Sequence, residues 1–179
     1  MITTASDNEI YFAKIRESAI IPTKKFEDAG YDMYANFEED YFLIKQGATR
    51  PVPTGIAVAF SPKFYAQVEE RGSTGKMGLK KSGGVFDSGY RGEYLILLYN
   101  ATGKPVVISK VEEQNIPETI TVDGEVLKKG EFNVYPYSKA ICQIVLQTVP
   151  DLASKEISYD ELKAIASERG SGRFGGSGK

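Results

Sequence analysis

The sequence predicts an all-β fold, either a sandwich or a barrel. Short runs of β-branched, aliphatic and aromatic residues recur along most of the chain. Turn-forming pairs such as Thr-Gly, Ser-Pro, Gly-Gly and Asp-Gly lie between these runs. Only one segment, close to the C-terminus, has the apolar spacing that a helix requires.

Each strand is predicted from its own pattern. Residues 9–16, EIYFAKIR, have the alternation of a half-buried strand, in which Tyr11, Ala13 and Ile15 alternate with Phe12, Lys14 and Arg16. Residues 55–60, GIAVAF, are apolar on both faces, as in a buried strand. The other predicted strands are FYAQVEE at 64–70, YLILLYN at 94–100 and ICQIVLQTV at 141–149.

The predicted helix covers residues 158–167, SYDELKAIAS. Ser158 is a suitable N-cap with Glu161 three residues later, and Leu162 and Ile165 share one face. This short helix is the one helical element expected in the domain.

The composition changes after the helix. Five of the last ten residues are glycine, and such a segment cannot bury enough apolar surface to fold alone. We therefore expect a β domain over residues 1–168 and a mobile segment over 169–179. The arginines and the phenylalanine of this segment suit a lid over an anionic, aromatic ligand.

The overall composition is that of an ordinary globular protein. The 179 residues are 41% hydrophobic and 26% charged, with a net charge of −2. This charge gives no sign of a surface for nucleic acid or membrane, and neither partner is expected. No signal peptide is recognisable in MITTASDNEI. Because the single Cys142 cannot form an internal disulfide, a cytoplasmic location is expected.

The absence of histidine from the sequence restricts the chemistry. Histidine-assisted nucleophiles and histidine-ligated metals are excluded, and so is a structural zinc site, because there is only one cysteine. Acid–base chemistry must use Asp, Glu, Lys, Tyr or the lone Cys. A hard cation such as Mg²⁺, held by oxygen ligands, remains compatible with the sequence.

The stretch GVFDSGYRGEY, residues 84–94, combines one carboxylate, Asp87, with Tyr90 among three glycines. Glycine permits unusual backbone angles and lets a ligand approach the chain closely. The stretch by itself allows two interpretations: a surface hairpin in which Asp and Gly only form the turn, or a ligand-binding hairpin.

Five segments, taken together, resemble the trimeric dUTPase (dUTP pyrophosphatase) family. The family's five motifs occur here in order, as AGYDMYA (29–35), ERGSTG (70–75), GVFDSGYRGE (84–93), KAICQIV (139–145) and RGSGRFGGSG (169–178). The resemblance implies a β-barrel-like jelly roll that assembles as a homotrimer. It also implies hydrolysis of dUTP to dUMP and pyrophosphate in the cytoplasm of a bacterial or phage-infected cell.

By this resemblance, the third motif carries the chemistry. Asp87 takes the place of the base that activates water for in-line attack on the α-phosphate. Tyr90 takes the place of the residue that excludes a 2′-hydroxyl. The backbone at Gly84 and Val85 belongs to the hairpin that reads the edge of uracil.

The other motifs imply contacts to the phosphates. Arg71 takes the place of a catalytic phosphate clamp, and Ser73 and Thr74 of phosphate contacts, although Gly72 stands where serine usually follows the arginine. Ordinary turn hydroxyls are the alternative for both. Gln143 takes the place of a phosphate-contacting glutamine.

The implied cofactor is Mg²⁺, which bridges the triphosphate oxygens and is held through water by Asp32. In the tail, Arg169 is implied to meet the γ-phosphate and Phe174 to cover the uracil ring. Further backbone N–H groups are implied at Gly175, Gly176 and Ser177.

Two positions depart from the fourth motif, since Lys139 and Ala140 replace an acidic residue and an arginine. Cys142 takes a small-residue position and is expected to be inert core. The dCTP deaminases share the fold, but the glutamate that activates water in that family corresponds to Leu97 here. Because leucine cannot transfer a proton, both a deaminase and a bifunctional enzyme are disfavoured.

A longer connection than in compact family members separates Tyr90 from Gln143. The additional residues lie around 110–132, where an Asp-Gly pair predicts an added hairpin. Such insertions resemble those of dUTPases from bacteriophages of Gram-positive bacteria, some of which contact regulatory proteins. Either a solvated insertion or a surface for a regulatory partner is compatible with the sequence.

Overall fold

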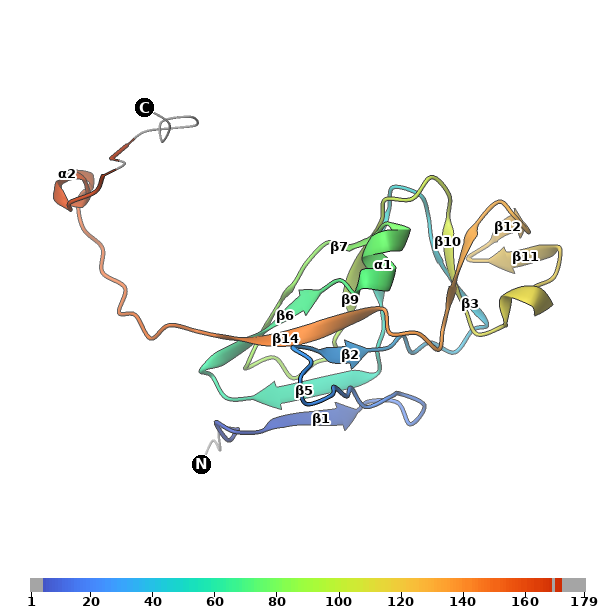
Figure 1. Ribbon diagram of the computed structural model, residues 1–179, viewed down its shortest axis with the longest axis horizontal. Helices are drawn as coiled ribbons and strands as arrows, with labels where there is room; N and C mark the ends of the chain where they lie inside the picture. The colour runs from blue at the N-terminus through green and yellow to red at the C-terminus, as the bar shows by residue number, and fades with distance from the viewer. Residues whose placement is uncertain (1–4, 169, 172–179) are drawn as a thin grey trace. The chain divides into compact units, whose positions relative to one another are not determined.

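The computed structural model describes residues 5–168, 170 and 171 (Figure 1). The chain divides into two compact units, residues 1–149 and residues 150–179. Within the described residues the chain is built mostly of β-strands, with two short α-helices, which confirms the predicted fold class.

The first unit contains all the strands found among the described residues. Their bounds are β1 Ile10–Lys14, β2 Tyr31–Met33, β3 Tyr41–Ile44, β4 Thr49–Val52, β5 Ile56–Phe60, β6 Phe64–Glu69, β7 Leu79–Lys81, β8 Val85–Asp87, β9 Ile96–Asn100, β10 Val106–Ser109, β11 Thr119–Val122, β12 Glu125–Lys128, β13 Asn133–Pro136 and β14 Cys142–Thr148. The helical elements are α1 Gly72–Met77, the 3₁₀ helix η1 Glu113–Asn115 and, in the second unit, α2 Tyr159–Ala164.

Most strands pair with partners that are distant in the sequence. The largest sheet has the order β2-β14-β6-β8, and three-stranded sheets have the orders β4-β9-β7 and β13-β10-β3. Strands β1 and β5 form a pair, and β11 and β12 form a hairpin. All these pairings are antiparallel except β10 with β13. This topology is that of the predicted jelly roll.

The sheets enclose one main core. Its fully buried side chains include Met33, Ile44, Val52, Ile56, Leu79, Ile96, Ile108 and Ile141. In β5, Ile56, Val58 and Phe60 are buried, whereas Ala57 and Ala59 are only half-buried. The strand predicted to be apolar on both faces therefore packs one face tightly and covers the other with small residues.

Strand β1 alternates as predicted, and its partner decides which side chains face inward. Phe12 lies opposite Val58 of β5 and packs against the core. Tyr11 and Ile15 belong to the other set and are exposed. Side chains of directly paired residues share one face of a sheet, and the buried Val58 therefore places Phe12, not Tyr11, toward the core.

A second apolar cluster lies beneath the β11–β12 hairpin. Its buried members are Leu43, Val107, Ile116, Ile120, Val122, Leu127 and Phe132. Neighbouring residues of β3 and β10, such as Ile44 and Ile108, belong to the main core instead. Both strands are thus covered on their two faces, and the residues around 110–132 are a packed part of the unit rather than a solvated loop.

The hairpin turn has the geometry that its sequence predicts. Asp123 and Gly124 both have positive φ, 52° and 78°, as a two-residue hairpin turn of this hand requires. Asp123 also forms an ion pair with Arg50, whose guanidinium lies 3.8 Å from the centroid of the Phe42 ring. These contacts fasten the hairpin to β3 and β4.

The second unit contains the predicted C-terminal helix. Ser158 accepts a hydrogen bond from the Glu161 N–H at 3.2 Å, and the Glu161 carboxylate accepts one from the Ser158 N–H at 2.8 Å. This capping box confirms the predicted start of α2. Leu162 and Ile165 are both exposed. No helix among the described residues is long and apolar enough to span a membrane.

The packing of the hairpin generates a test. Leu127→Ala should lower the free energy of unfolding by about 2 kcal/mol, because it removes buried methyl groups from the second cluster. Val126→Ala, on the outward face of the same strand, is the matched control and should change stability by less than about 0.5 kcal/mol. Urea unfolding measures both, and equal effects would contradict the packed arrangement.

Candidate active site

A pocket of about 430 Å³ opens where β2, β14 and the start of α1 meet. It is lined by Asp28, Ala29, Gly30, Asp32, Arg71, Gly72, Ser73 and Gln143. The pocket therefore unites residues from the first, second and fourth of the sequence segments singled out above.

Strand register brings these residues together. Gln143 of β14 lies opposite Asp32 of β2 on one side and Glu69 of β6 on the other. Arg71 follows two residues after Glu69, so it reaches the same end of the sheet. Its Nε lies 2.9 Å from Asp32 Oδ1, which leaves the planar guanidinium fixed at the edge of the pocket.

Gly30 allows the close approach on which the pocket depends. A Cβ atom built at Gly30 would lie 2.6 Å from Gln143 Oε1 and 3.0 Å from Gln143 Cβ. The Gln143 amide in turn donates from Nε2 to the Glu70 carbonyl at 3.3 Å. Any side chain at position 30 would therefore displace Gln143 from the pocket wall.

The segment around the second motif forms a helix that sequence patterns did not predict. Thr74 is buried, and its hydroxyl accepts from the Arg71 N–H and donates to the Arg71 carbonyl, both at 3.0 Å. Gly78, at φ 96°, ends the helix in the left-handed conformation. Thr74 thus organises the turn, whereas Ser73 and Gly72 line the pocket.

Tyr135 of β13 is a neighbour of the pocket that sequence reasoning missed. Its hydroxyl donates to the Ala140 carbonyl at 2.6 Å. Burial raises the pKa of Tyr135, and a hydrogen bond with Ser73 and the charge of Arg71 offset this only in part. Cys142 is buried, which confirms its predicted place in the core, and burial raises the pKa of its thiol.

The third segment forms a separate hairpin beyond β8. The Tyr90 N–H donates to the Asp87 carbonyl at 3.1 Å, which closes the turn. The Asp87 carboxylate is exposed. Val85 is also exposed, and the Gly84 carbonyl accepts from the Val68 N–H at 2.7 Å. A carboxylate and a stretch of backbone are thus presented together to solvent.

Within one chain this hairpin lies far from the pocket. Asp87 pairs with Tyr65 of β6, and Tyr65 lies opposite Gln147 of β14. Gln147 is four residues beyond Gln143, which pairs with Asp32. Three strand spacings of about 4.8 Å and four residues of about 3.3 Å separate Asp87 from Asp32 by roughly 20 Å. One chain alone does not bring its predicted site residues together.

The remaining predicted residues fall at the C-terminus. Arg169, Phe174, Gly175, Gly176 and Ser177 lie outside the described residues. Leu97 lies in β9 with its side chain partly exposed.

The acidic side chains at the pocket can bind a cation only if other groups, such as substrate phosphates and water, complete its coordination. Among the described residues no three Asp, Glu or Cys side chains cluster as a metal site would require. Two carboxylate residues, Asp28 and Asp32, line the pocket. Mg²⁺ commonly binds to one or two carboxylates together with substrate phosphates and water, and this donor set matches that mode.

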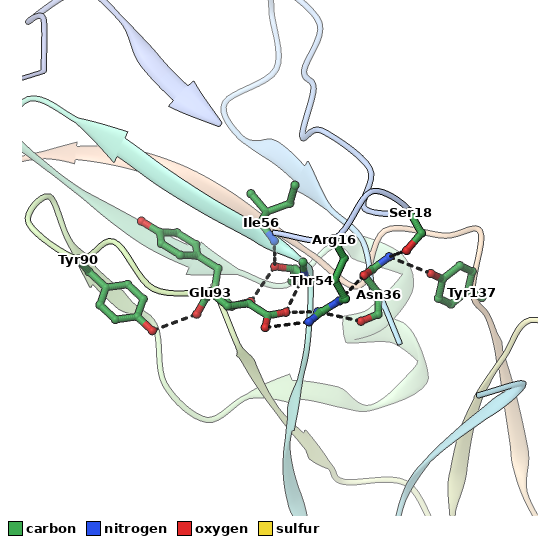
Figure 2. Close-up of polar contacts among 10 residues, drawn as sticks. Arg16, Ser18, Asn36, Thr54, Ile56, Tyr90, Glu93 and Tyr137 are labelled. Atoms are coloured by element: carbon green, nitrogen blue, oxygen red, sulfur yellow. Dashed lines mark hydrogen bonds and ion pairs between the residues drawn. The ribbon is translucent and has the colours of Figure 1, made fainter. Parts of the chain in front are cut away.

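A partly buried polar network lies beside the hairpin of the third segment (Figure 2). The Arg16 guanidinium pairs with the Glu93 carboxylate, and its Nε donates to Asn36 Oδ1 at 2.7 Å. The Gly55 N–H donates to Glu93 Oε1 at 2.7 Å. Burial alone would raise the pKa of Glu93, but its hydrogen bonds with Arg16 and Gly55 outweigh burial and lower the pKa.

Comparison with known proteins identifies the family. The dUTPase family model matches residues 16–113. The deoxyuridine 5′-triphosphate nucleotidohydrolase of Debaryomyces hansenii is 32% identical over 165 residues, which cover 91% of this chain and 83% of that protein. The chain belongs to the dUTPase family. This assignment confirms the resemblance seen in the motifs and the enzyme class that it implied.

Solved structures agree with the family assignment at the level of the fold. The dUTPase of Staphylococcus bacteriophage 80alpha with dUpNHpp matches with a TM-score of 0.70 and 20% identity, over 96% of this chain and 99% of that one. A viral relative is a longer protein: the Pol polyprotein of Ovine maedi visna related virus is 34% identical over 101 residues, but this chain spans only 9% of it.

The close approach at Gly30 generates a prediction for this dUTPase-family pocket. Gly30→Ala should weaken the binding of inorganic pyrophosphate about tenfold, because the added methyl group displaces Gln143. Gly103→Ala is the matched control, since a Cβ at Gly103 meets no atom within 4 Å. Calorimetry measures both affinities, and equal binding by the two variants would contradict the role of Gln143.

The network around Glu93 generates a second prediction. Because the folded-state pKa of Glu93 is lowered, its stabilisation is present above the unfolded pKa and is lost as the pH falls through the folded value. Glu93→Gln should cost about 2 kcal/mol near neutral pH, and the difference from wild type should shrink on acidification. Urea unfolding of both proteins from neutral to acidic pH measures this difference in stability. A difference that stays constant with pH would contradict the prediction.

Proposed function

We propose that this protein hydrolyses dUTP to dUMP and pyrophosphate. The observation that carries the proposal is the convergence of Asp32, Arg71, Ser73 and Gln143 at one pocket. These residues come from three separate motifs, and they supply a cation, a hydroxyl and an amide donor suited to phosphate oxygens. The family membership and the nucleotidohydrolase relatives support dUTP as the substrate.

The triphosphate lies in this pocket. Arg71 faces phosphate oxygens with its fork of donors while the bond to Asp32 holds its orientation. Gln143 contributes its amide, and Ser73 its hydroxyl. Asp32, together with the substrate's phosphates, would hold Mg²⁺ through water, and the bound ion would supply charge neutralisation at the phosphate oxygens.

Asp87 is the general base of the reaction. Its carboxylate accepts a proton from water as the water oxygen attacks the α-phosphorus in line. The bond from the α-phosphorus to the bridging oxygen breaks, and pyrophosphate leaves with the electron pair. The step uses no covalent intermediate, in keeping with a sequence that has no histidine to activate a nucleophile.

The active site is shared between subunits of a homotrimer. The separation of roughly 20 Å between Asp87 and the phosphate pocket of the same chain supports this arrangement. A triphosphate is far shorter than this gap, so the base must come from a second chain. The tail residues Arg169 and Phe174 then close over the nucleotide, and Gly175–Ser177 add backbone donors.

Tyr90 and the β8 hairpin select the nucleoside. The Tyr90 ring occupies the position where a ribose 2′-hydroxyl would protrude. Backbone groups at Gly84 and Val85 read the uracil edge, since Val85 is exposed and lies in β8, at the edge of its sheet. The Tyr90 ring thus selects the deoxyribose and the hairpin backbone selects the uracil.

One assay tests the proposal directly. Incubation with dUTP and Mg²⁺ should yield dUMP and pyrophosphate, whereas dCTP and UTP should be poor substrates. Asp87→Asn should lower turnover by about two to four orders of magnitude and leave nucleotide binding nearly intact, because it removes only the base. Near-normal turnover by the purified variant would refute the role of Asp87.

Mixed assembly tests the shared site. Asp87→Asn subunits and subunits truncated after Glu168 should each be inactive alone and recover activity when assembled together. Recovery requires that one chain supply the base and another the tail. Absence of recovery in verified mixed trimers, or a monomer by light scattering, would be contrary to the proposal.

Regulatory binding through residues 110–132 is a second candidate function. The packed cluster beneath the β11–β12 hairpin favours it, because a surface held rigidly suits recognition. The solved dUTPase of phage phi11 of S. aureus displays a species-specific insert. Val126→Glu, on the outer face of the hairpin, should abolish a cellular regulatory effect and leave dUTP turnover intact. If Asp87→Asn abolishes the effect and Val126→Glu does not, the hairpin is not the regulatory surface.

A further inference from the structure

Tyr90 is held in place by three kinds of contact. Its hydroxyl donates to the Glu93 carbonyl at 3.1 Å. Its ring lies beside those of Phe86 and Tyr94, with centroids 6.0 Å away in each case. The backbone of Gly92 passes under the ring so closely that any Cβ there would overlap the Tyr90 hydroxyl. The position of Tyr90 therefore follows the position of the backbone at residues 92 and 93.

The Glu93 side chain fixes that backbone to the rest of the fold. Arg16 binds both carboxylate oxygens, and the Gly55 N–H donates to Oε1 at 2.7 Å (Figure 2). Only 19% of the side chain is exposed, so these bonds are little screened by water. Glu93 thus connects the end of the hairpin to the loops after β1 and before β5.

Arg16 is itself held at fixed orientation. Its Nε donates to Asn36 Oδ1 at 2.7 Å and its Nη2 to the Asn36 carbonyl at 3.1 Å. The Asn36 amide donates onward to the Ser18 hydroxyl at 3.0 Å. Gly55, at φ 67°, leaves room for this group, since a Cβ there would lie 2.7 Å from Asn36 Oδ1.

We propose that Arg16 and Glu93 are positioning residues that set the discrimination between deoxyribose and ribose by holding Tyr90 in place. The inference rests on the proposed function, and it extends that function to Arg16, which lies outside the five motifs, and to Glu93, which ends the third motif. A ring that excludes a hydroxyl by contact must not move, since a displacement of about 1 Å removes the clash. Loss of the Arg16–Glu93 clamp therefore lets UTP enter.

The test compares Arg16→Gln, Arg16→Lys and Glu93→Gln with wild type. The ratio of kcat/KM for dUTP to that for UTP should fall about fivefold or more in Arg16→Gln and Glu93→Gln. Arg16→Lys keeps the charge and should retain part of the ratio. Lys63→Gln, which breaks the more exposed ion pair with Asp7, is the matched control and should leave the ratio unchanged.

A second readout does not depend on turnover. With 3-fluorotyrosine incorporated and the Tyr90 resonance assigned by Tyr90→Phe, the fluorine signal of Tyr90 should shift or broaden in Arg16→Gln. The affinities of inert imido analogues of dUTP and UTP should converge in the same variant. Thermal unfolding of each variant shows that it is folded at the assay temperature.

The outcomes separate the two proposals. If wild type hydrolyses dUTP but the variants keep the full dUTP-to-UTP ratio and an unchanged Tyr90 resonance, Arg16 and Glu93 serve stability alone and the inference is overturned. If wild type neither binds nor hydrolyses dUTP, the proposed function fails, and the inference fails with it. A lowered ratio with a shifted Tyr90 resonance supports both.

Discussion

The pairing of β14 with both β2 and β6 is the constraint on which the site depends. It places Gln143 between Asp32 and Glu69, so residues more than seventy positions apart in the sequence line one pocket. The same antiparallel register carries β8 away from that end of the sheet. In the proposed mechanism, the phosphate-binding residues and the general base therefore lie at opposite ends of one sheet, and catalysis requires that copies of this sheet come together.

Local signals predicted the elements that depend on local interactions. The capping box at Ser158 and Glu161 and the turn at Asp123 and Gly124 involve neighbours in sequence, and both have the expected geometry. Helix α1 was missed because its sequence, GSTGKM, contains two glycines and has low helix propensity. The Thr74 hydroxyl and its tertiary surroundings override that propensity. The inward face of β1 was likewise decided by its partner strand rather than by its own alternation.

The motif residues could be located from the sequence because a resemblance carried their roles, but their supports could not. Arg16 follows a half-exposed strand, and its sequence context is that of a surface residue. Its partners lie 20 and 77 positions away, and no periodicity encodes such pairs. Tyr135 is similar, since only the fold brings its hydroxyl beside the second motif. The side chains proposed to contact the nucleotide were thus found from sequence motifs, whereas those that support them were found only from the structure.

The two-sided burial of β3 and β10 links an accessory hairpin to the composition of these two strands. Leu43 and Val107 point into the cluster beneath the hairpin. In a chain without residues 110–132 these two side chains would face water, and a sheet with exposed aliphatic residues invites association with other chains. Gain or loss of the hairpin therefore requires a change between polar and apolar residues at positions 43 and 107, both of which precede the hairpin in the sequence. A relative with a short connection should therefore carry polar residues at both positions.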